Sequence, residues 1–248
     1  MPGPPPITSS SNEVSTVQRS QVFAVGDENV EHDDDPQCSE LRMLEYYRAR
    51  APLLRYENLS PETTRVLEAY GEYIGRKLAG RSVLEVACGT GFWTQMLAQH
   101  AREVVATDAA PEMLTFARAR SYPGSNVQLS LRDAYSLDSL QRVFDGGFHF
   151  QWISHVPRSR LSDFFQVFHE RLAPGAIVVF GDNKDQGDQP DAEGNLYQDR
   201  ALPDGSRHRV IKNWPRIEEL RNLLSPYSER VEIEQFEKDW FVCYTLRK

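Results

Sequence analysis

The chain has 248 residues, of which 40% are hydrophobic and 26% are charged, and its formal net charge is −8. This length and composition are ordinary for a soluble globular protein that forms one α/β domain with a tail. The acidic balance argues against a nucleic-acid partner, because phosphate binding requires a basic surface. No apolar run approaches the ~20 residues that are needed to cross a membrane. Three widely spaced cysteines, and first residues without a secretory signal pattern, predict a cytoplasmic protein.

The first 80 residues divide into an extension and a helical cap. Residues 1–36 are rich in proline, serine and acidic residues, which predicts disorder, because such a segment cannot bury enough apolar surface to offset its ordering entropy. Residues 37–80 are predicted to form the N-terminal helical cap. Its second helix begins after Ser60, a favourable N-cap, with Pro61 in the first turn.

Residues 81–248 alternate apolar runs with helical runs, a pattern that is typical of a parallel sheet with helices on both faces. The first five expected strands are 82–87, 103–108, 127–130, 146–151 and 176–181. The expected helices are 92–100, 111–119, 158–172 and 215–224. The last stretch, 229–236 and 240–246, is predicted to form two strands joined by a short turn.

A long insertion spans residues 183–213. It contains two strand-like runs around Pro203-Asp204-Gly205, which predicts a β-hairpin. Ligands bind at the carboxyl edge of open α/β sheets, and the insertion follows a strand that ends there. We therefore expect this hairpin to be a lid over that edge.

A glycine-rich segment connects the first two strands of this core. Residues 83–93 read Val-Leu-Glu-Val-Ala-Cys-Gly-Thr-Gly-Phe-Trp, and residues 104–108 read Val-Val-Ala-Thr-Asp. A strand, a glycine turn, a helix start and a second strand that ends in an acid describe a nucleoside-binding βαβ unit. The third glycine of the dinucleotide pattern is missing, so this turn is poorly suited to bind a pyrophosphate.

The pattern Glu85-x-Ala87-x-Gly89-x-Gly91 resembles the first signature of class I, Rossmann-like S-adenosylmethionine (SAM) dependent methyltransferases, with Ala87 in place of a family glycine. The resemblance extends from about residue 41 to the C-terminus. It implies a doubly wound, mostly parallel seven-stranded sheet that is closed by an antiparallel hairpin. It also implies SAM as the cofactor, and transfer of its methyl group to a small-molecule acceptor.

The same resemblance implies which residues bind SAM. In the family the glycine turn lies against the methionine part of the cofactor, and the acid at Asp108 accepts from the ribose. Leu131-Arg132-Asp133-Ala134 matches a further signature, whose acid accepts from the adenine amino group. The full set that we expect at the cofactor is Glu85, Ala87, Gly89, Gly91, Asp108, Ala109, Asp133, Ala134 and Phe150.

Two residues are candidates for catalysis. His155 follows the fourth strand, a region that lies beside the transferred methyl in the family, and histidine titrates near neutrality. His155 is therefore a candidate base or hydrogen-bonding group, or alternatively only a structural donor. Tyr47-x-x-x-Ala51 fits the spacing of a helix that related enzymes place over the cofactor, with the tyrosine hydroxyl near the methionine end. Leu54 and Arg55 depart from the residues that follow in those relatives.

The acceptor is expected to contact aromatic and amide side chains around the same edge. Phe150 and Trp152 alternate with His149 along the fourth strand, which predicts that both face the cofactor side. The candidate substrate-binding residues are Tyr46, Tyr56, Trp152, Asn183 and Asn213. No metal-ligand spacing is present, since the histidines are scattered and the cysteines are unpaired.

Three functional hypotheses follow. The first is a methyltransferase that acts on a small molecule, as a monomer or weak homodimer. The second is a SAM-consuming cyclase, since the overall layout also resembles azetidine-2-carboxylate synthases, which share the fold and release methylthioadenosine. The third is a non-catalytic SAM-binding module.

Overall fold

The computed structural model describes residues 36–54, 59–184, 190–191 and 194–247, with side chains from residue 39 onward. Residues 1–35 of the expected extension lie outside the described residues, and so does Tyr56, an expected acceptor-binding residue. In the part of the chain that is described, no helix is both long and apolar enough to cross a bilayer.

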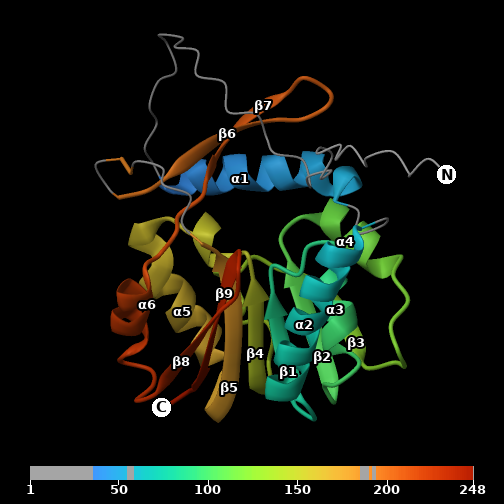
Figure 1. Cartoon of the computed structure of the whole chain (residues 1–248), viewed down its shortest axis with the longest axis vertical. Helices are drawn as coiled ribbons and strands as arrows, with labels where there is room; N and C mark the ends of the chain where they lie inside the picture. Colours follow the sequence, from blue (N-terminus) through green and yellow to red (C-terminus); the bar gives the residue numbers. More distant parts are fainter. Residues whose placement is uncertain (1–35, 55–58, 185–189, 192–193, 248) are drawn as a thin grey trace, which may run out of the picture.

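Seven strands form one sheet in the order β3-β2-β1-β4-β5-β9-β8 (Figure 1). The first five strands are parallel, whereas β9 runs antiparallel to both of its neighbours. Their bounds are β1 Ser82–Val86, β2 Glu103–Asp108, β3 Val127–Leu131, β4 Phe144–Phe150, β5 Leu172–Asn183, β8 Val231–Gln235 and β9 Asp239–Thr245. The predicted seven-stranded, doubly wound sheet with a C-terminal antiparallel hairpin is confirmed.

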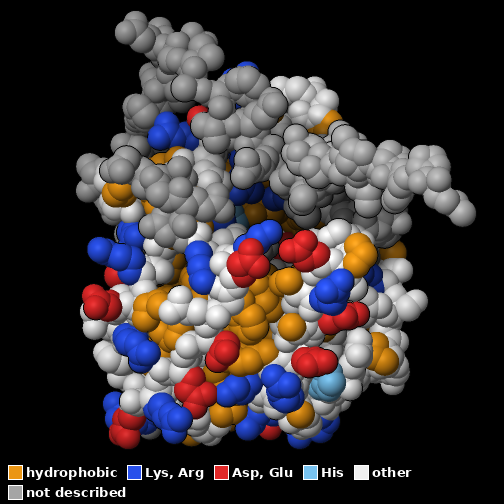
Figure 2. Space-filling view, in the orientation of Figure 1, with side chains coloured by type: hydrophobic (Ala, Val, Ile, Leu, Met, Phe, Trp, Pro, Cys, Tyr) orange, Lys and Arg blue, Asp and Glu red, His pale blue; other side chains and the backbone are white. Residues whose placement is uncertain are grey.

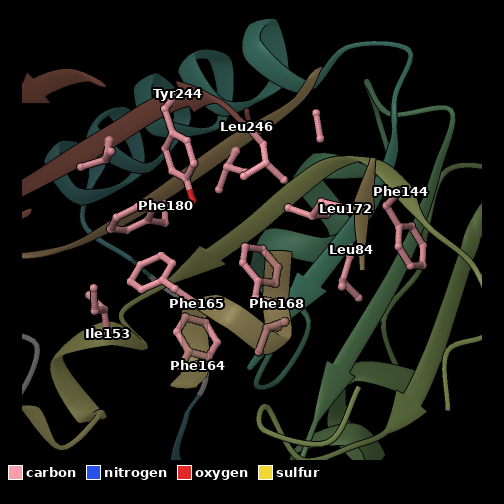
Figure 3. Packing of buried hydrophobic residues seen from close by; sticks show 14 of the residues in the cluster. Leu84, Phe144, Ile153, Phe164, Phe165, Phe168, Leu172, Phe180, Tyr244 and Leu246 are labelled. Carbon is pink, nitrogen blue, oxygen red and sulfur yellow. The ribbon is translucent and has the colours of Figure 1, made fainter. Parts of the chain in front are cut away.

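Helices bury apolar side chains on both faces of this sheet. The flanking helices are α2 Pro61–Leu78, α3 Phe92–Leu97, α4 Pro111–Arg118, α5 Leu161–Glu170 and α6 Ile217–Leu224. One hydrophobic cluster joins α2, α3 and α4 to the sheet, and a second joins α5 and α6 to the opposite face. In Figure 3, Phe164, Phe165 and Phe168 of α5 lie against the strands that carry Phe180 and Tyr244. Burial on both faces fits the mostly apolar central strands β1 and β2, whereas β3, at the edge of the sheet, is only partly buried.

The carboxyl edge of the sheet is covered by a separate layer (Figure 1). Helix α1 (Pro36–Arg50) lies across this edge, and the hairpin of β6 (Tyr197–Ala201) and β7 (Arg207–Ile211) lies on its outer side. The predicted hairpin is confirmed, but it covers α1 and not the strand ends directly. The reason is that Met43 and Tyr46 of α1 pack in one cluster with hairpin residues.

Several element boundaries differ from the sequence-based expectation. The predicted helix 158–172 is shorter, because residues 158–160 form a 3₁₀ turn and Leu172 already pairs with Phe144 of β4. Helix α2 begins as predicted, since the Ser60 hydroxyl accepts a hydrogen bond from the Thr63 N–H at 3.1 Å. A capped, preset first turn of this kind stabilises a helix by about 1 kcal/mol.

Candidate active site

The turn after β1 is built from backbone conformations that side chains rarely adopt. Ala87, Gly89 and Gly91 have φ angles of 54°, 57° and 76°. At Gly91 a Cβ atom would lie 2.5 Å from the Tyr122 hydroxyl and 3.0 Å from the Ala117 Cβ, so only glycine fits. Ala87 adopts the same left-handed region with a side chain, at a cost on the order of 1 kcal/mol. The turn therefore holds a strained bend that brings bare backbone to the sheet edge.

Asp108, at the end of β2, fastens this turn. Its two carboxylate oxygens accept hydrogen bonds from the Gly89 N–H and the Ala110 N–H, both at 2.8 Å. Burial raises the pKa of Asp108 to about 6, although these two backbone N–H groups oppose the rise. Each oxygen keeps a second lone pair, so the carboxylate can still accept from hydroxyl groups of a ligand.

Glu85 lies behind the turn and is 2% exposed. Its Oε2 atom is buried without a hydrogen-bond partner. Burial raises the pKa of Glu85 to about 8, and the neighbouring Asp108 carboxylate adds to the rise. A buried acid without a cation is costly unless it is neutral or a positive group approaches it. The turn is thus an electrostatically prepared place for a cationic ligand.

The second predicted acid, Asp133, lies at the end of β3 beside this turn. The Arg132 N–H donates to the Asp108 carbonyl at 3.0 Å, which ties the two segments together. Asp133 is exposed, and its Oδ1 atom accepts from the Tyr135 N–H at 2.8 Å. Ala134 is buried, and Ala109 is half-buried next to Asp108. The predicted cofactor residues of β1, β2 and β3 therefore converge on one edge, while their ligand roles stay predictions.

The two candidate catalytic residues are in direct contact. The Tyr47 hydroxyl lies 2.7 Å from His155 Nε2, and His155 Nδ1 lies 2.6 Å from the Ile211 carbonyl oxygen. A carbonyl only accepts, so Nδ1 carries the proton and donates to Ile211, and Nε2 accepts from the Tyr47 hydroxyl. Burial, together with the Lys212 and Arg200 cations, holds the pKa of His155 well below its ordinary value. His155 is therefore a neutral acceptor that orients Tyr47.

The direct base role of His155 stays a prediction, and this geometry favours the alternative that His155 is a structural hydrogen-bonding group. Its basic nitrogen is already bonded to Tyr47, and the imidazole is 5% exposed. Tyr47 is half-buried and packs both against the hairpin cluster and against Ala110, which follows Asp108. The phenol oxygen of Tyr47 therefore lies between α1 and His155.

A buried ion pair holds the segment that carries His155 in place. Lys212 Nζ donates to Asp182 Oδ1 at 3.1 Å and to the Ser154 hydroxyl at 2.7 Å, and the Ser154 N–H donates to Asp182 at 2.9 Å. Lys212 and Asp182 are 5% and 0% exposed, so the pair is removed from solvent. It joins β5, the base of the hairpin and the short 3₁₀ helix that carries His155 (Ile153–His155).

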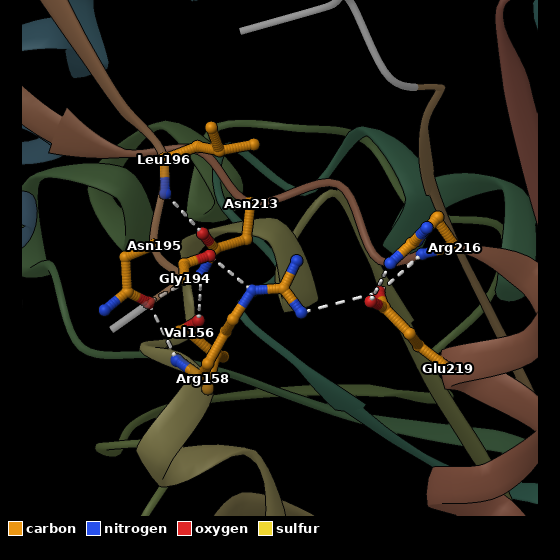
Figure 4. A network of polar contacts seen from close by, with 8 residues as sticks. All are labelled: Val156, Arg158, Gly194, Asn195, Leu196, Asn213, Arg216 and Glu219. Carbon is orange, nitrogen blue, oxygen red and sulfur yellow. Dashed lines mark hydrogen bonds and ion pairs between the residues drawn. The ribbon is translucent and has the colours of Figure 1, made fainter. Parts of the chain in front are cut away.

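Asn213 has a structural position, in contrast to its predicted contact with the acceptor. Its Oδ1 accepts from the Leu196 N–H at 2.8 Å, and its Nδ2 donates to the Val156 carbonyl at 2.9 Å (Figure 4). Nδ2 also donates to Asn195 Oδ1 at 3.2 Å, and the side chain is 2% exposed. All polar atoms of the Asn213 amide are thus used to anchor the base of the hairpin.

The prediction that Phe150 and Trp152 share one face is wrong. Phe150 packs with Trp93 and Phe241 on one side of the sheet, at ring-centroid distances of 4.9 and 5.1 Å. Trp152 lies instead with Tyr135 and Phe164 of the opposite cluster. The strand ends at Phe150, and the next residue, Gln151, has a φ of 53°, which breaks the two-residue alternation.

The remaining predicted acceptor residues flank the edge. The Asn183 amide donates to Asp239 Oδ1 at 2.7 Å, and the Tyr70 hydroxyl donates to Asp239 Oδ2 at 2.8 Å. Tyr46 is buried between α1 and the hairpin, where its hydroxyl accepts from Arg200 at 3.3 Å. Sequence reasoning missed Arg200, Asp239 and Tyr70 because none belongs to a recognisable motif.

A strained glycine turn with the buried Glu85 and the half-buried Asp108 beside it, at the carboxyl edge of a parallel sheet, is typical of a nucleoside-binding α/β protein. The comparisons with known proteins narrow this class. Residues 83–175 match the family described as "Methyltransferase domain". The chain is also 26% identical to a protein titled "DhpI-SAH complex structure", with a TM-score of 0.70 and coverage of 85% of this chain and 98% of that one. The same values for identity and TM-score are found for a "DhpI-SAM-HEP complex".

Curated relatives agree at the level of the class. The malonyl-[acyl-carrier protein] O-methyltransferase of Pectobacterium atrosepticum is 24% identical over 152 residues, which cover 60% of this chain and 51% of that protein. The ubiquinone biosynthesis O-methyltransferase of Xanthomonas euvesicatoria is 35% identical over 92 residues, which cover 35% of this chain and 38% of that protein. The matched region thus spans about half the length of the first relative and less than half the length of the second. Residues 83–175 therefore carry a methyltransferase domain, and the chain as a whole is similar in fold to the protein of the SAH and SAM complexes.

Proposed function

We propose that this protein transfers a methyl group from SAM to a small-molecule acceptor that binds between the sheet edge and α1. The observation that carries the proposal is the closure of the glycine turn by Asp108, whose carboxylate fastens Gly89 at 2.8 Å. The matches to methyltransferases of small and carrier-bound molecules support the reaction type.

The residues present fit SAM. The left-handed turn offers bare backbone, the unpartnered Glu85 Oε2 belongs to a buried carboxyl that a cationic ligand would favour in its ionised form, and Asp108 keeps lone pairs for ribose hydroxyls. Asp133, at the end of β3, is suited to accept from an adenine amino group, since its Oδ2 is not used in the bond to Tyr135. When bound, SAM supplies a methyl group on a positively charged sulfur.

Methyl transfer depends chiefly on alignment, because proximity and orientation of the two reactants are worth several kcal/mol. Tyr47 gives its proton to the hydrogen bond with His155, and its oxygen also interacts with Arg200, which leaves one lone pair of that oxygen for a ligand. This lone pair can accept a hydrogen bond from an O–H or N–H group of the acceptor and fix its orientation. In this proposal His155 is a positioning residue, and the buried pair of Lys212 and Asp182 keeps it in place.

Calorimetry and product analysis test the proposal. Asp108→Ala should abolish measurable SAM binding, whereas Asp138→Ala, a change of an exposed acid, should leave it intact. Incubation with SAM and a panel of small acceptors should release S-adenosylhomocysteine (SAH). Methylthioadenosine formed without any acceptor would instead support the cyclase hypothesis, and binding without any product would support the non-catalytic module.

We further propose that the protein works in the cytoplasm as a monomer or weak homodimer, without a nucleic-acid partner. The net charge of −8 supports the absence of a nucleic-acid partner. Light scattering of the purified protein would test the oligomeric state. Retention on a nucleic-acid column at low salt would test the absence of a nucleic-acid partner.

A further inference from the structure

Two arginines lie between α1 and the hairpin without an acid to balance them. Arg200 of β6 donates to the Tyr46 hydroxyl at 3.3 Å and to Gln198 Oε1 at 2.8 Å, and its Nε is buried without a partner. The Arg50 guanidinium carbon lies 5.6 Å from the Tyr46 ring centre and 6.0 Å from that of Tyr47. Among the described residues, neither arginine forms an ion pair with a carboxylate.

The surrounding charges increase this imbalance. Lys212 is already neutralised by Asp182 at 3.1 Å, so that acid is not available to the arginines. The positive charges of Lys212, Arg200 and Arg50 all reach His155, where they add to the effect of burial in lowering its pKa. A guanidinium donor that is buried without an acceptor is unfavourable. The Tyr46 and Tyr47 oxygens partly stabilise the Arg200 cation, but its Nε still lacks the acceptor that an anion would supply.

The cluster is also adjacent to the proposed acceptor position. Tyr46 and Tyr47 are consecutive on α1, and Arg200 contacts the first while Tyr47 is bonded to His155. Figure 2 shows that the surface is hollowed above the sheet, with basic side chains visible inside. An anionic group held here would place the rest of its molecule within reach of the Tyr47 oxygen.

We propose that Arg200 and Arg50 bind an anionic oxyacid group of the acceptor, a carboxylate or a phosphate-like group, with the Tyr46 hydroxyl as a further contact. This inference rests on the proposed function, because it names the acceptor class of the same site. Guanidinium is the side chain best matched to such groups, since its planar N–H donors pair with two oxygens at once. The simpler alternative is that Arg200 only stacks on Tyr46, at 5.6 Å from the ring centre.

Binding of inorganic phosphate and of acetate to the SAH-saturated full-length protein tests the inference. Calorimetry at constant ionic strength should detect saturable binding of at least one anion, and the preferred anion identifies the oxyacid class. Arg200→Met should weaken that binding at least tenfold, the loss expected when a charge-assisted hydrogen bond is removed. The matched control is Arg209→Met on β7, an exposed arginine stacked on Tyr197 at 4.6 Å, which should change nothing. SAH affinity should be the same in all three proteins.

Each contrary result overturns the inference in a recognisable way. Saturable binding of neither anion, or equal loss in both variants, would show that the arginines form no specific site. Anion binding that is found in the SAH-free protein and is lost in the SAH-saturated protein would mean that the arginines hold the carboxylate of the cofactor. If Arg200→Met does not fold, Arg50→Met on α1 provides the same test from the other side of the cluster. Failure of SAH itself to bind would contradict the proposed function and is measured separately.

Discussion

The buried Glu85 carboxyl should make the ligand-free protein less stable as the pH rises, and Glu85→Gln should remove this effect. The pKa of Glu85 is about 8 in the folded protein, against an ordinary value of 4.5. Below the lower value the carboxyl is protonated in both states. Between the two values only the unfolded chain releases the proton readily, so folding stability falls with rising pH and this loss levels off above the folded pKa.

The magnitude follows from the two pKa values. Between about pH 5 and about pH 8.5, proton release by the unfolded chain lowers the free energy of unfolding of the wild type by about 4 kcal/mol, and the glutamine variant does not show this loss. Urea unfolding of both proteins at the two pH values measures the difference. Glu234→Gln, at an exposed position of β8, is the control and should track the wild type.

SAM provides a second measurement on the same pair of proteins. A positively charged ligand favours the ionised carboxylate, so the SAM affinity of the wild type should rise with pH toward the pKa of about 8. In Glu85→Gln this rise should be weaker. Parallel stability profiles for wild type and Glu85→Gln would refute the assignment of a raised pKa to Glu85, and with it the view that this acid awaits a cation.

Four further substitutions probe other parts of the site. Tyr47→Phe and His155→Gln should each lower kcat at least tenfold with SAM affinity retained. Equal losses in the single and double variants would show that the two residues act as one unit. Unchanged turnover in both single variants would exclude a role of this pair in the reaction. Asn213→Ala should lower the free energy of unfolding by about 2–3 kcal/mol, since it leaves the Leu196 N–H and the Val156 carbonyl without their partner, and an unchanged urea midpoint would contradict this. Ala87→Gly should keep SAM affinity and change the free energy of unfolding by less than about 1 kcal/mol. The reason is that relief of the left-handed backbone offsets the added freedom of the unfolded chain. A large loss of stability would mean that packing of the Ala87 methyl group outweighs the relief of backbone strain.

The sequence allowed those parts of the site that are built locally to be predicted. The glycine turn and Asp108 belong to one βαβ unit, so their spacing along the chain determines their spacing in space. The contact between Tyr47 and His155 joins residues 108 positions apart, and the hydrogen bond that makes His155 an acceptor comes from the later hairpin. No local pattern encodes such a meeting.

The errors have equally specific causes. Trp152 was assigned to the wrong face because strand alternation assumes a regular backbone, and the left-handed Gln151 ends that regularity. Asn213 was assigned to the acceptor because polar residues near a sheet edge are good candidates, whereas a buried amide with all its atoms bonded serves the fold. Arg200 escaped attention since a basic residue in a hairpin is usually exposed, and only the packing of α1 against the hairpin covers its Nε.

The position of α1 separates the glycine turn from the contact between Tyr47 and His155. The turn and Asp108 come from neighbouring strands of the sheet, whereas Tyr47 reaches His155 only because α1 packs against the hairpin and against Ala110. We therefore expect that a change which detaches this helix would abolish turnover and leave the turn able to bind its nucleoside.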